Sequence, residues 1–243
     1  MKAIILNSGM GTRLGDLTQN NPKSLVNLTE NQTILSRALS ILSNFDIDEF
    51  IITTGYLNKV LINYCEKNFP DINFTFVHNP IYDKTNYIKS LDNIDKLDGD
   101  IILLHGDLVF SMKTAEKIVN SKESCVVVDT SIEIPQDDFK AKIENNCIEY
   151  IGVDYFEDDA VACQPFYKLK NNDWQMWKDN INNFCTMNVN SSLKISMEYL
   201  KLFLRILLTT QTILKNTGRI MFFMVTTGRR VFKAESETML YKL

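Results

Sequence analysis

Short apolar runs alternate with segments of helical periodicity through the first half of the chain, and this alternation limits the possible folds more than any other feature. Five runs lack the 3.6-residue period of an amphipathic helix and read as buried strands. They span residues 2–7, 49–54, 73–78, 100–105 and 124–129. The segments between them have helical character, at residues 33–45, 57–69, 87–97 and 111–120. The alternation predicts right-handed βαβ units, and therefore a mostly parallel sheet with helices on both faces.

The pattern changes after Asp129. Three short runs of alternating character, at residues 139–143, 147–153 and 161–169, predict antiparallel strands. A last segment, residues 171–184, carries Trp174, Trp177 and Ile181 at helical spacing, which predicts a helix with these side chains in the core. The sequence therefore predicts an α/β protein with three layers and a mixed, mostly parallel, Rossmann-like sheet.

One edge of this sheet is the expected place for function, because ligands of open α/β sheets bind beyond the carboxyl ends of the strands. The loops that follow the predicted parallel strands should meet at that edge. They are residues 8–15, 55–56, 79–86 and 106–107. We therefore expect the functional residues among these loops, including Gly55 and Tyr56 after the second strand.

Composition excludes several classes of protein. The net charge of −4 gives little support to a nucleic-acid partner. The five cysteines form no CxxC pair and the chain has only two histidines, which argues against a zinc cluster and a disulfide framework. The apolar run after Met1 is too short for a signal peptide, and no stretch approaches the roughly 20 apolar residues of a membrane span. We expect a cytoplasmic protein without a membrane span.

The first loop is rich in glycine and is followed by two basic residues. Glycine lets backbone N–H groups approach a polyphosphate closely. Arg13 can grip phosphate oxygens with two hydrogen bonds, and Lys23 supplies a point charge. The GxxxxGK[ST] motif of a P-loop is absent from the sequence, and Thr53-Thr54-Gly55 stands where an NAD-binding protein has an acidic ribose ligand. The loop therefore favours a nucleotide polyphosphate other than NAD.

The order of strand, GxGTRL and then PK resembles the signature of the sugar-phosphate nucleotidyltransferase superfamily. The matching residues are Gly9, Gly11, Thr12, Arg13, Leu14, Pro22 and Lys23. The resemblance implies a nucleotide-diphospho-sugar transferase-like fold. It also implies that the loop wraps the NTP phosphates and that Arg13 and Lys23 are catalytic, because they neutralise charge in the transition state. The loop residues expected to bind the nucleotide are Leu6, Asn7, Ser8, Gly9, Met10, Gly11 and Thr12, with Gly55 and Tyr56 beside them. This chain departs from the family at Asn7 and Ser8, where many members have two alanines.

Asp107 follows the fourth predicted strand in the sequence His105-Gly106-Asp107. Members of the superfamily place a strand-end Asp here to hold Mg²⁺, so the resemblance assigns the metal to Asp107. The chemistry agrees with this assignment, because Mg²⁺ prefers one or two carboxylates together with phosphate oxygens. Taken alone, an Asp after a strand is more often a turn former.

The segment from Asn79 to Leu91 resembles the small-alcohol branch of the superfamily, the phosphocholine and aminoethylphosphonate cytidylyltransferases. The resemblance favours CTP and places Asn86 and Ser90 near the base and ribose, although Asn86 also suits a helix N-cap. Within this branch the runs from Phe74 to Phe110 and from Asp138 to Ile143 most resemble bacterial capsule-locus enzymes, one group of which activates phosphoglutamine with CTP. Lys140 and Gln164 are expected to contact the acceptor; a solvated strand-edge lysine and a buried strand are the alternative interpretations.

The composition changes abruptly from Ser191 onward. Residues 191–243 hold nine basic and three acidic residues, and no Asp follows Asp179. Superfamily members normally finish with acidic segments, one of which supplies a second carboxylate for Mg²⁺. We therefore predict a nucleotidyltransferase domain at residues 1–190 and an atypical tail at residues 191–243. Our hypothesis is that the tail is a frameshifted or foreign segment that weakens the metal site.

The motifs and the resemblance together predict a magnesium-dependent nucleotidyltransferase. It would transfer NMP from an NTP, with CTP favoured, to a small phosphorylated acceptor and release pyrophosphate. Synthesis of a capsule or surface polysaccharide precursor is the expected context. Two alternatives stay open: a hexose-1-phosphate nucleotidyltransferase, and a non-catalytic nucleotide-binding remnant.

Overall fold

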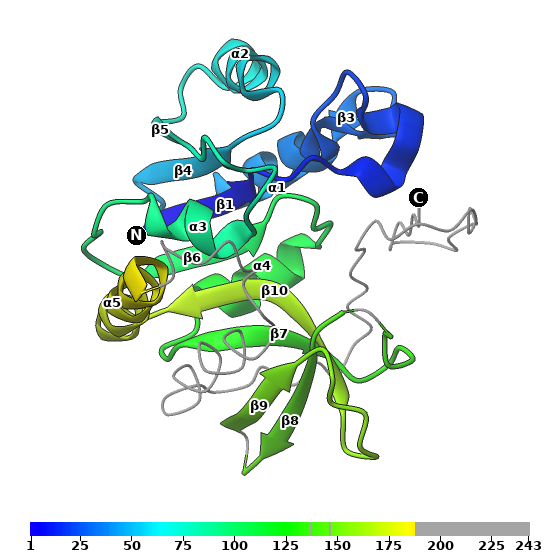
Figure 1. The fold of residues 1–243 in the computed structure, drawn as a ribbon, viewed down its shortest axis with the longest axis vertical. Coiled ribbons are helices and arrows are strands. Elements are labelled where there is room, and N and C mark those ends of the chain that lie inside the picture. Colours follow the sequence, from blue (N-terminus) through cyan, green and yellow to red (C-terminus); the bar gives the residue numbers. More distant parts are fainter. Residues whose placement is uncertain (137, 146, 188–243) are drawn as a thin grey trace.

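The computed structural model describes residues 1–136, 138–145 and 147–187. Over these residues the chain forms one mixed sheet of eight strands, with helices on both faces, and a separate two-stranded hairpin (Figure 1). This arrangement confirms the predicted three-layer α/β fold. The predicted tail, residues 191–243, lies outside the described residues, so the division of the chain at residue 190 stays a prediction.

Four parallel strands form one half of the sheet, in the order β5-β4-β1-β6. Their bounds are β1 (Lys2–Asn7), β4 (Glu49–Thr54), β5 (Phe74–His78) and β6 (Ile101–His105). Central strands of this kind are covered on both faces, which explains their continuous apolar runs. In β1, for example, Ala3 and Ile5 face one core and Ile4 faces the other, and all three are fully buried.

Antiparallel strands form the other half. They are β7 (Cys125–Asp129), β8 (Lys140–Glu144), β9 (Cys147–Gly152) and β10 (Val161–Leu169). The long strand β10 pairs with β6 through Phe166–Leu169, with β8 through Val161 and Ala162, and with β7 along a register interrupted by a bulge after Gln164. Strand β7 runs in the same direction as β6, as the alternation of strands and helices predicts, because both strands pair with β10 in the antiparallel direction. The sequence does not predict that β10 lies between them.

Helices cover both faces of the sheet. On one face lie α1 (Ile34–Leu42), α2 (Asn58–Asn68) and α4 (Met112–Val119), and on the other lie α3 (Tyr87–Asp92) and α5 (Asn171–Met187). Local sequence explains where several of them begin. Thr33 and Ser36 form a reciprocal capping box at the start of α1, and Ser111 caps α4 by accepting a hydrogen bond from the Thr114 N–H.

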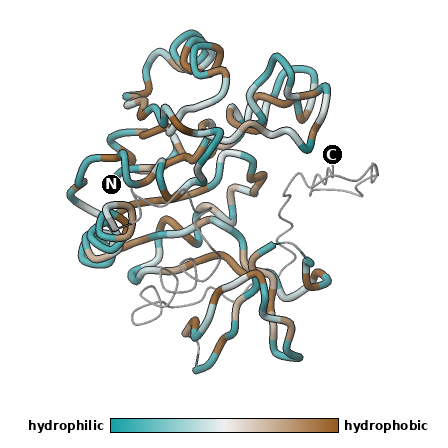
Figure 2. The backbone as a smooth tube through the Cα atoms, viewed as in Figure 1, coloured by the Kyte–Doolittle hydropathy of each residue, from teal (hydrophilic) through white to brown (hydrophobic). Residues whose placement is uncertain are grey.

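Two hydrophobic cores result, one on each face of the sheet. Figure 2 shows hydrophobic residues gathered along the central strands and hydrophilic ones toward the outer helices and loops. Trp174, Trp177 and Ile181 of α5 are buried in the core that also holds α3, as their spacing predicts. Burial of these side chains stabilises the fold by about 25 cal/mol for each Å² of apolar surface removed from water. The parallel half and its cores thus form a rigid platform for the loops above it.

Some local structure differs from the sequence prediction. Residues 12–18, expected to be loop, form short 3-10 turns (η1, Thr12–Thr18), and a second 3-10 turn follows (η2, Lys23–Leu25). A small hairpin, β2 (Asn27–Thr29) with β3 (Gln32–Thr33), was not predicted. Helix α3 is also shorter than expected: it ends at Asp92, with Asn93 as its C-cap, whereas the sequence predicts a helix over residues 87–97. Within the described part of the chain, none of the helices has both the length and the apolar character to cross a membrane.

Candidate nucleotide-binding site

A cavity of about 380 Å³ opens at the carboxyl ends of the parallel strands. Loops that are far apart in the sequence meet around it: the loop after β1, the segment that joins β5 to α3, and the residues after β6. Twelve of the sequence-predicted site residues line it. They are Leu6, Asn7, Ser8, Gly9, Met10, Gly11, Thr12, Arg13, Lys23, Asn86, Ser90 and Asp107. The predicted meeting of these loops at one edge of the sheet is therefore confirmed, while the roles of the individual residues stay predictions.

The glycines of the first loop shape the cavity wall in two ways. Gly11 has a φ of +66°, in the left-handed region, where a side chain would be strained. An added Cβ at Gly9 would meet no atom of residues 1–136, 138–145 and 147–187 within 4 Å, so in this part of the chain the backbone at Gly9 is open to the cavity. A loop with this geometry can present N–H groups to a phosphate without obstruction.

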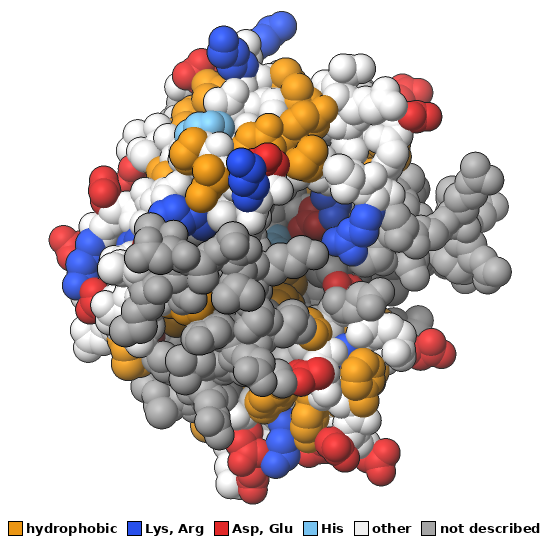
Figure 3. Space-filling view, viewed as in Figure 1, with side chains coloured by type: hydrophobic (Ala, Val, Ile, Leu, Met, Phe, Trp, Pro, Cys, Tyr) orange, Lys and Arg blue, Asp and Glu red, His pale blue; other side chains and the backbone are white. Residues whose placement is uncertain are grey.

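An ion pair crosses the cavity wall. The ammonium nitrogen of Lys23 lies 2.5 Å from a carboxylate oxygen of Asp107, and each side chain is only 18% exposed. Figure 3 shows basic and acidic side chains side by side in a hollow near the centre of the face drawn. Burial alone would raise the pKa of Asp107, but the charge and hydrogen bond of Lys23, with a contribution from His105, hold it below its ordinary value of 3.8. Asp107 is therefore a carboxylate at neutral pH.

Arg13 and His105 complete the charged and titratable groups around the ion pair. The Arg13 side chain is exposed at the mouth of the cavity. His105 packs against Tyr87 with ring centroids 5.1 Å apart. Burial lowers the pKa of His105 below 6.5; Asp107 opposes this effect and Lys23 adds to it. At neutral pH the site therefore presents His105 as a neutral ring beside the basic side chains of Arg13 and Lys23.

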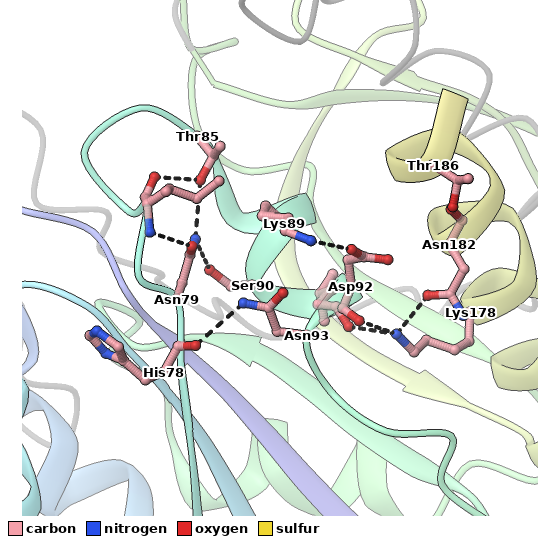
Figure 4. A network of polar contacts seen from close by, with 12 residues as sticks. His78, Asn79, Thr85, Lys89, Ser90, Asp92, Asn93, Lys178, Asn182 and Thr186 are labelled. Carbon is pink, nitrogen blue, oxygen red and sulfur yellow. Dashed lines mark hydrogen bonds and ion pairs between the residues drawn. The ribbon is translucent and has the colours of Figure 1, made fainter. Parts of the chain in front are cut away.

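A buried polar network ties the glycine loop to α3, and Figure 4 shows its part around Asn79, Thr85 and Ser90. The Ser90 hydroxyl donates to the Ser8 hydroxyl at 2.9 Å, and the Asn79 amide donates to Ser90 and to Thr85, each at 3.1 Å. Ser8, Asn79 and Ser90 are all buried. Asn86 is exposed and caps α3, since its side-chain oxygen accepts a hydrogen bond from the Ile88 N–H at 3.0 Å. In this structure Ser90 is thus a support for the loop, and Asn86 holds a helix N-terminus at the cavity.

Two side-chain polar atoms in the cavity wall have no hydrogen-bond partner among the described residues. They are the amide nitrogen of Asn7 and the hydroxyl of Ser24, and both atoms are buried. Asn7 can lie at the end of β1 only because residue 106 is glycine, since a Cβ there would overlap the Asn7 amide. Buried polar atoms are almost always paired, so an unpaired one beside a cavity points to a ligand atom.

Gly55 and Tyr56 lie behind the wall rather than in it. A Cβ at Gly55 would overlap the Ser8 carbonyl oxygen and the side chain of Tyr82, a cavity-lining residue. The Tyr56 hydroxyl donates to the Gln19 carbonyl at 2.6 Å, which ties the start of α2 to the first loop. Both residues therefore support the site from outside it, and direct contact with a nucleotide stays a prediction.

Lys140 and Gln164 do not line the cavity. The expectation of a solvated strand-edge lysine is wrong, because Lys140 is fully buried. Its ammonium group donates to the carbonyls of Gln136 and Val153, at 2.8 and 2.5 Å, and lies 4.0 Å from the ring centroid of Phe156. Gln164 is 7% exposed and precedes the bulge in β10. Their roles toward an acceptor stay predictions.

Sequence reasoning did not assign several residues of the cavity wall. They are Leu14, Ser24, Thr53, Asn79, Tyr82, Thr85, Tyr87, His105 and Gly106. A signal existed for most of them, because they belong to the strand-end segments 79–91 and 105–107 or directly follow Leu6–Arg13 and Lys23. Thr53 is different: its hydroxyl accepts a hydrogen bond from the Asn7 N–H at 3.0 Å, a contact between β1 and β4 that only the fold creates.

The described residues that line the cavity offer one carboxylate, that of Asp107, as a ligand for a magnesium ion. Among the described residues that line the cavity, Asp107 is the only carboxylate, and no group of three His, Cys, Asp or Glu residues that suits a metal occurs in the described chain. Mg²⁺ in nucleotide sites is commonly held by one or two carboxylates, with phosphate oxygens and water as the other ligands. The described residues therefore suit a cation that arrives with a triphosphate better than a cation bound by protein alone.

The comparisons with known proteins agree with this geometry. A family model described as "Nucleotidyl transferase" matches residues 2–138. The CTP:phosphoglutamine cytidylyltransferase of Campylobacter jejuni is 36% identical over 140 residues, which cover 54% of this chain and 53% of that protein. The choline-phosphate cytidylyltransferase of Haemophilus influenzae is 32% identical over 111 residues, or 46% of each chain. The chain thus spans about half the length of these curated relatives.

Solved structures share the fold. The CTP:phosphocholine cytidylyltransferase of Streptococcus pneumoniae superimposes with a TM-score of 0.63 at 19% sequence identity, over 88% of this chain and 90% of that one. At this identity the likeness concerns the fold alone, and it agrees with the mixed, mostly parallel sheet described above.

Proposed function

The chain belongs to the nucleotidyl transferase family, and from this premise we propose that it transfers a nucleoside monophosphate from an NTP to a small phosphorylated acceptor, with release of pyrophosphate. The observation that carries the proposal is the cavity itself. It brings an open glycine loop, two cations and an ionised carboxylate together at the carboxyl edge of a parallel sheet. Such an arrangement suits a triphosphate.

The proposed reaction is an in-line displacement at the α-phosphorus. An oxygen of the acceptor phosphate forms the new bond while the bond to pyrophosphate breaks. The nucleophile is already ionised at neutral pH, so the reaction needs no general base, which agrees with a neutral, buried His105. Arg13 and Lys23 would stabilise the charge on the phosphates, and the loop would orient them. Asp107 would hold Mg²⁺, which when bound neutralises charge at the α-phosphate.

CTP is the proposed nucleotide, and phosphocholine or phosphoglutamine represents the proposed class of acceptor. Support comes from the relatives named above, because both are cytidylyltransferases that act on small phosphorylated compounds, as their names state. We further propose that the reaction takes place in the cytoplasm, where NTPs are made, and that it supplies a precursor of a capsule or surface polysaccharide. The five cysteines, which all lie in the described residues, are free thiols, as expected in a reducing compartment.

A pyrophosphate-release screen of the full chain tests the proposal. Each of the four NTPs is combined with phosphocholine, phosphoglutamine and a hexose 1-phosphate in the presence of Mg²⁺. We expect release with CTP and a small acceptor, and its loss in Arg13→Ala. Release only with a hexose 1-phosphate would favour the alternative nucleotidyltransferase. Binding of CTP without release under any condition would contradict a catalytic function and favour a nucleotide-binding remnant.

A further inference from the structure

The two residues expected to bind different ligands bind each other in this structure. Lys23 is expected to contact phosphate and Asp107 to hold a cation, yet their charged atoms lie 2.5 Å apart. Both side chains line the cavity, and both are shielded from water to the same extent, at 18% exposure. The two residues are 84 positions apart in the sequence, and their ion pair joins η2 to the segment that follows β6.

Either ligand alone meets an obstacle at this pair. A divalent cation that approaches Asp107 must displace the Lys23 ammonium, which then lies partly buried without its counter-charge. A triphosphate that attracts Lys23 must leave the Asp107 carboxylate facing its own negative charge, and like charges at short range repel strongly in a shielded site. No other carboxylate among the described lining residues offers the cation a second position.

Both obstacles disappear when the two ligands arrive together. Lys23 then exchanges Asp107 for a phosphate oxygen, and Asp107 exchanges Lys23 for the cation, so every charge keeps a partner. We propose that the Lys23–Asp107 ion pair makes the site selective for the complex of a divalent cation with a nucleoside triphosphate, and that it weakens the binding of free cation and of free triphosphate. The inference rests on the proposed function, because it presumes that a nucleotide occupies this cavity.

Coupling of this kind is reciprocal: the cation must raise the affinity for the nucleotide by the same factor by which the nucleotide raises the affinity for the cation. Three dissociation constants of the full chain measure it. The first is the dissociation constant for Mn²⁺ alone, measured by electron paramagnetic resonance. The second and third are the dissociation constants for CTP in EDTA and for CTP with saturating Mg²⁺, both measured by calorimetry. In the wild type we expect Mg²⁺ to tighten CTP binding by about tenfold or more, within the range of typical coupling factors.

Two substitutions break the pair from opposite sides. Lys23→Met removes the competitor of the cation, so Mn²⁺ alone should bind severalfold more tightly than to the wild type. Asp107→Asn removes the carboxylate that repels a free triphosphate, so CTP in EDTA should bind at least as tightly as to the wild type, and Mg²⁺ should no longer improve it. The matched controls are Lys84→Met and Asp83→Asn, two exposed neighbours in the segment between β5 and α3 that do not line the cavity. They should leave all three constants unchanged.

The outcomes separate this inference from the proposed function. If the wild type binds CTP equally well with and without Mg²⁺, or if Lys23→Met binds Mn²⁺ no more tightly than the wild type does, the coupling is wrong although the site still binds nucleotide. If no NTP binds to the wild type under any condition, the proposed function fails and the coupling fails with it. Circular dichroism of each variant verifies its fold, and Asp107→Asn tests the same pair should Lys23→Met not fold.

Discussion

The two halves of the sheet treat buried polar groups in opposite ways. In the parallel half, such groups collect at the edge where all four strands end, and they face a cavity: Lys23 and Asp107 as an ion pair, Asn7 and Ser24 with unpaired atoms. In the antiparallel half and the helix that follows it, the buried lysines Lys140, Lys168 and Lys178 each donate hydrogen bonds to two main-chain carbonyls. Lys168 donates to Val119 and Ser121, for example.

Strand direction explains the difference. Parallel strands bring all their carboxyl ends, and the loops that follow, to one edge, so side chains from distant segments converge there. Antiparallel strands send alternate ends to opposite edges, and a polar group among them finds its partners in the nearby backbone. Lys178 of α5 follows the second pattern, because its ammonium group donates to the carbonyls of Leu91 and Asp92 at the end of α3. The comparison teaches that Arg13 and Lys23 at the parallel edge face a cavity, whereas the buried lysines elsewhere bind main-chain carbonyls and stabilise the fold.

The largest expected effect is on catalysis, in Arg13→Ala. We expect kcat/KM to fall by about 100- to 1000-fold, the cost of one lost electrostatic donor in a transition state. The free energy of unfolding should stay unchanged, because the Arg13 side chain is exposed. The measurement is steady-state pyrophosphate release beside urea unfolding.

Arg37→Ala is the matched control for that prediction. Arg37 is half-buried, and its guanidinium donates to the Phe110 carbonyl at 3.3 Å, far from the glycine loop in sequence. Its removal should cost about 1 kcal/mol of stability and leave the turnover of folded enzyme intact. Wild-type turnover in Arg13→Ala would refute the catalytic assignment of that residue.

The second effect is on stability, in Lys168→Met. This side chain is 6% exposed, and its loss leaves two carbonyls without a donor at the end of α4. We expect a loss of about 1–3 kcal/mol in the free energy of unfolding, with nucleotide affinity unchanged. Lys170→Met is the control, because that side chain is 42% exposed and pairs with Asp100 at the surface. A drop in nucleotide affinity without a loss of stability in Lys168→Met would break the distinction between the two halves.

The third effect concerns the backbone of the first loop, in Gly9→Ala. An added methyl group at Gly9 meets no atom of the described residues within 4 Å, so thermal stability should not change. If the backbone approaches the phosphates closely, the methyl group will displace them, and we expect CTP to bind about tenfold more weakly, equal to about 1.4 kcal/mol. Gly106→Ala, by contrast, should lower the thermal stability, because its Cβ would overlap the side chain of Asn7. Unchanged CTP affinity in Gly9→Ala would place the phosphates elsewhere.

The sequence predicts the parallel half well, because its signals are local. Apolar runs such as residues 2–7 and 101–105 mark strands, and strands of one direction determine which loops meet. Arg13, Lys23 and Asp107, which are separated by 10 and 84 positions in the sequence, are then brought together by a topology that the alternation of elements already implies. The glycine loop and the cavity at the strand ends follow from the same pattern.

The antiparallel half is less predictable, since its pairings join distant segments. Nothing near residues 124–129 indicates that β10 will pair with them in the opposite direction. Lysine is normally an exposed residue, so periodicity cannot reveal that Lys140, Lys168 and Lys178 are buried; their partners are carbonyls of other elements. The Ser8–Ser90 hydrogen bond could not be predicted for the same reason, because it joins the glycine loop after β1 to α3.

The smallest effect is expected at the opposite edge of the parallel half, in Glu49→Gln. Glu49 begins β4, lies 2.6 Å from the ammonium of Lys2 and accepts a hydrogen bond from the Thr75 hydroxyl. These contacts, Lys2 first, hold the pKa of Glu49 below its ordinary value of 4.5 and outweigh the effect of burial. The folded state therefore binds this proton less tightly than the unfolded state does, so the carboxylate stabilises the fold fully above about pH 4.5, and this contribution is lost as the pH falls through the lowered pKa.

The stability difference between wild type and Glu49→Gln should accordingly be largest near neutral pH and shrink below about pH 4.5, with a size under about 1 kcal/mol because water still reaches the pair. Urea unfolding of both proteins between pH 3 and pH 7 measures it, and CTP affinity at pH 7 should be identical in the two. Two ion pairs of similar geometry would then have different roles. Lys2–Glu49, at the amino ends of the parallel strands, would affect only the stability of the fold. Lys23–Asp107, at their carboxyl ends, would affect the binding of a ligand. A change in CTP affinity in Glu49→Gln would contradict this division, because an ion pair at the amino ends of the strands would then also affect ligand binding.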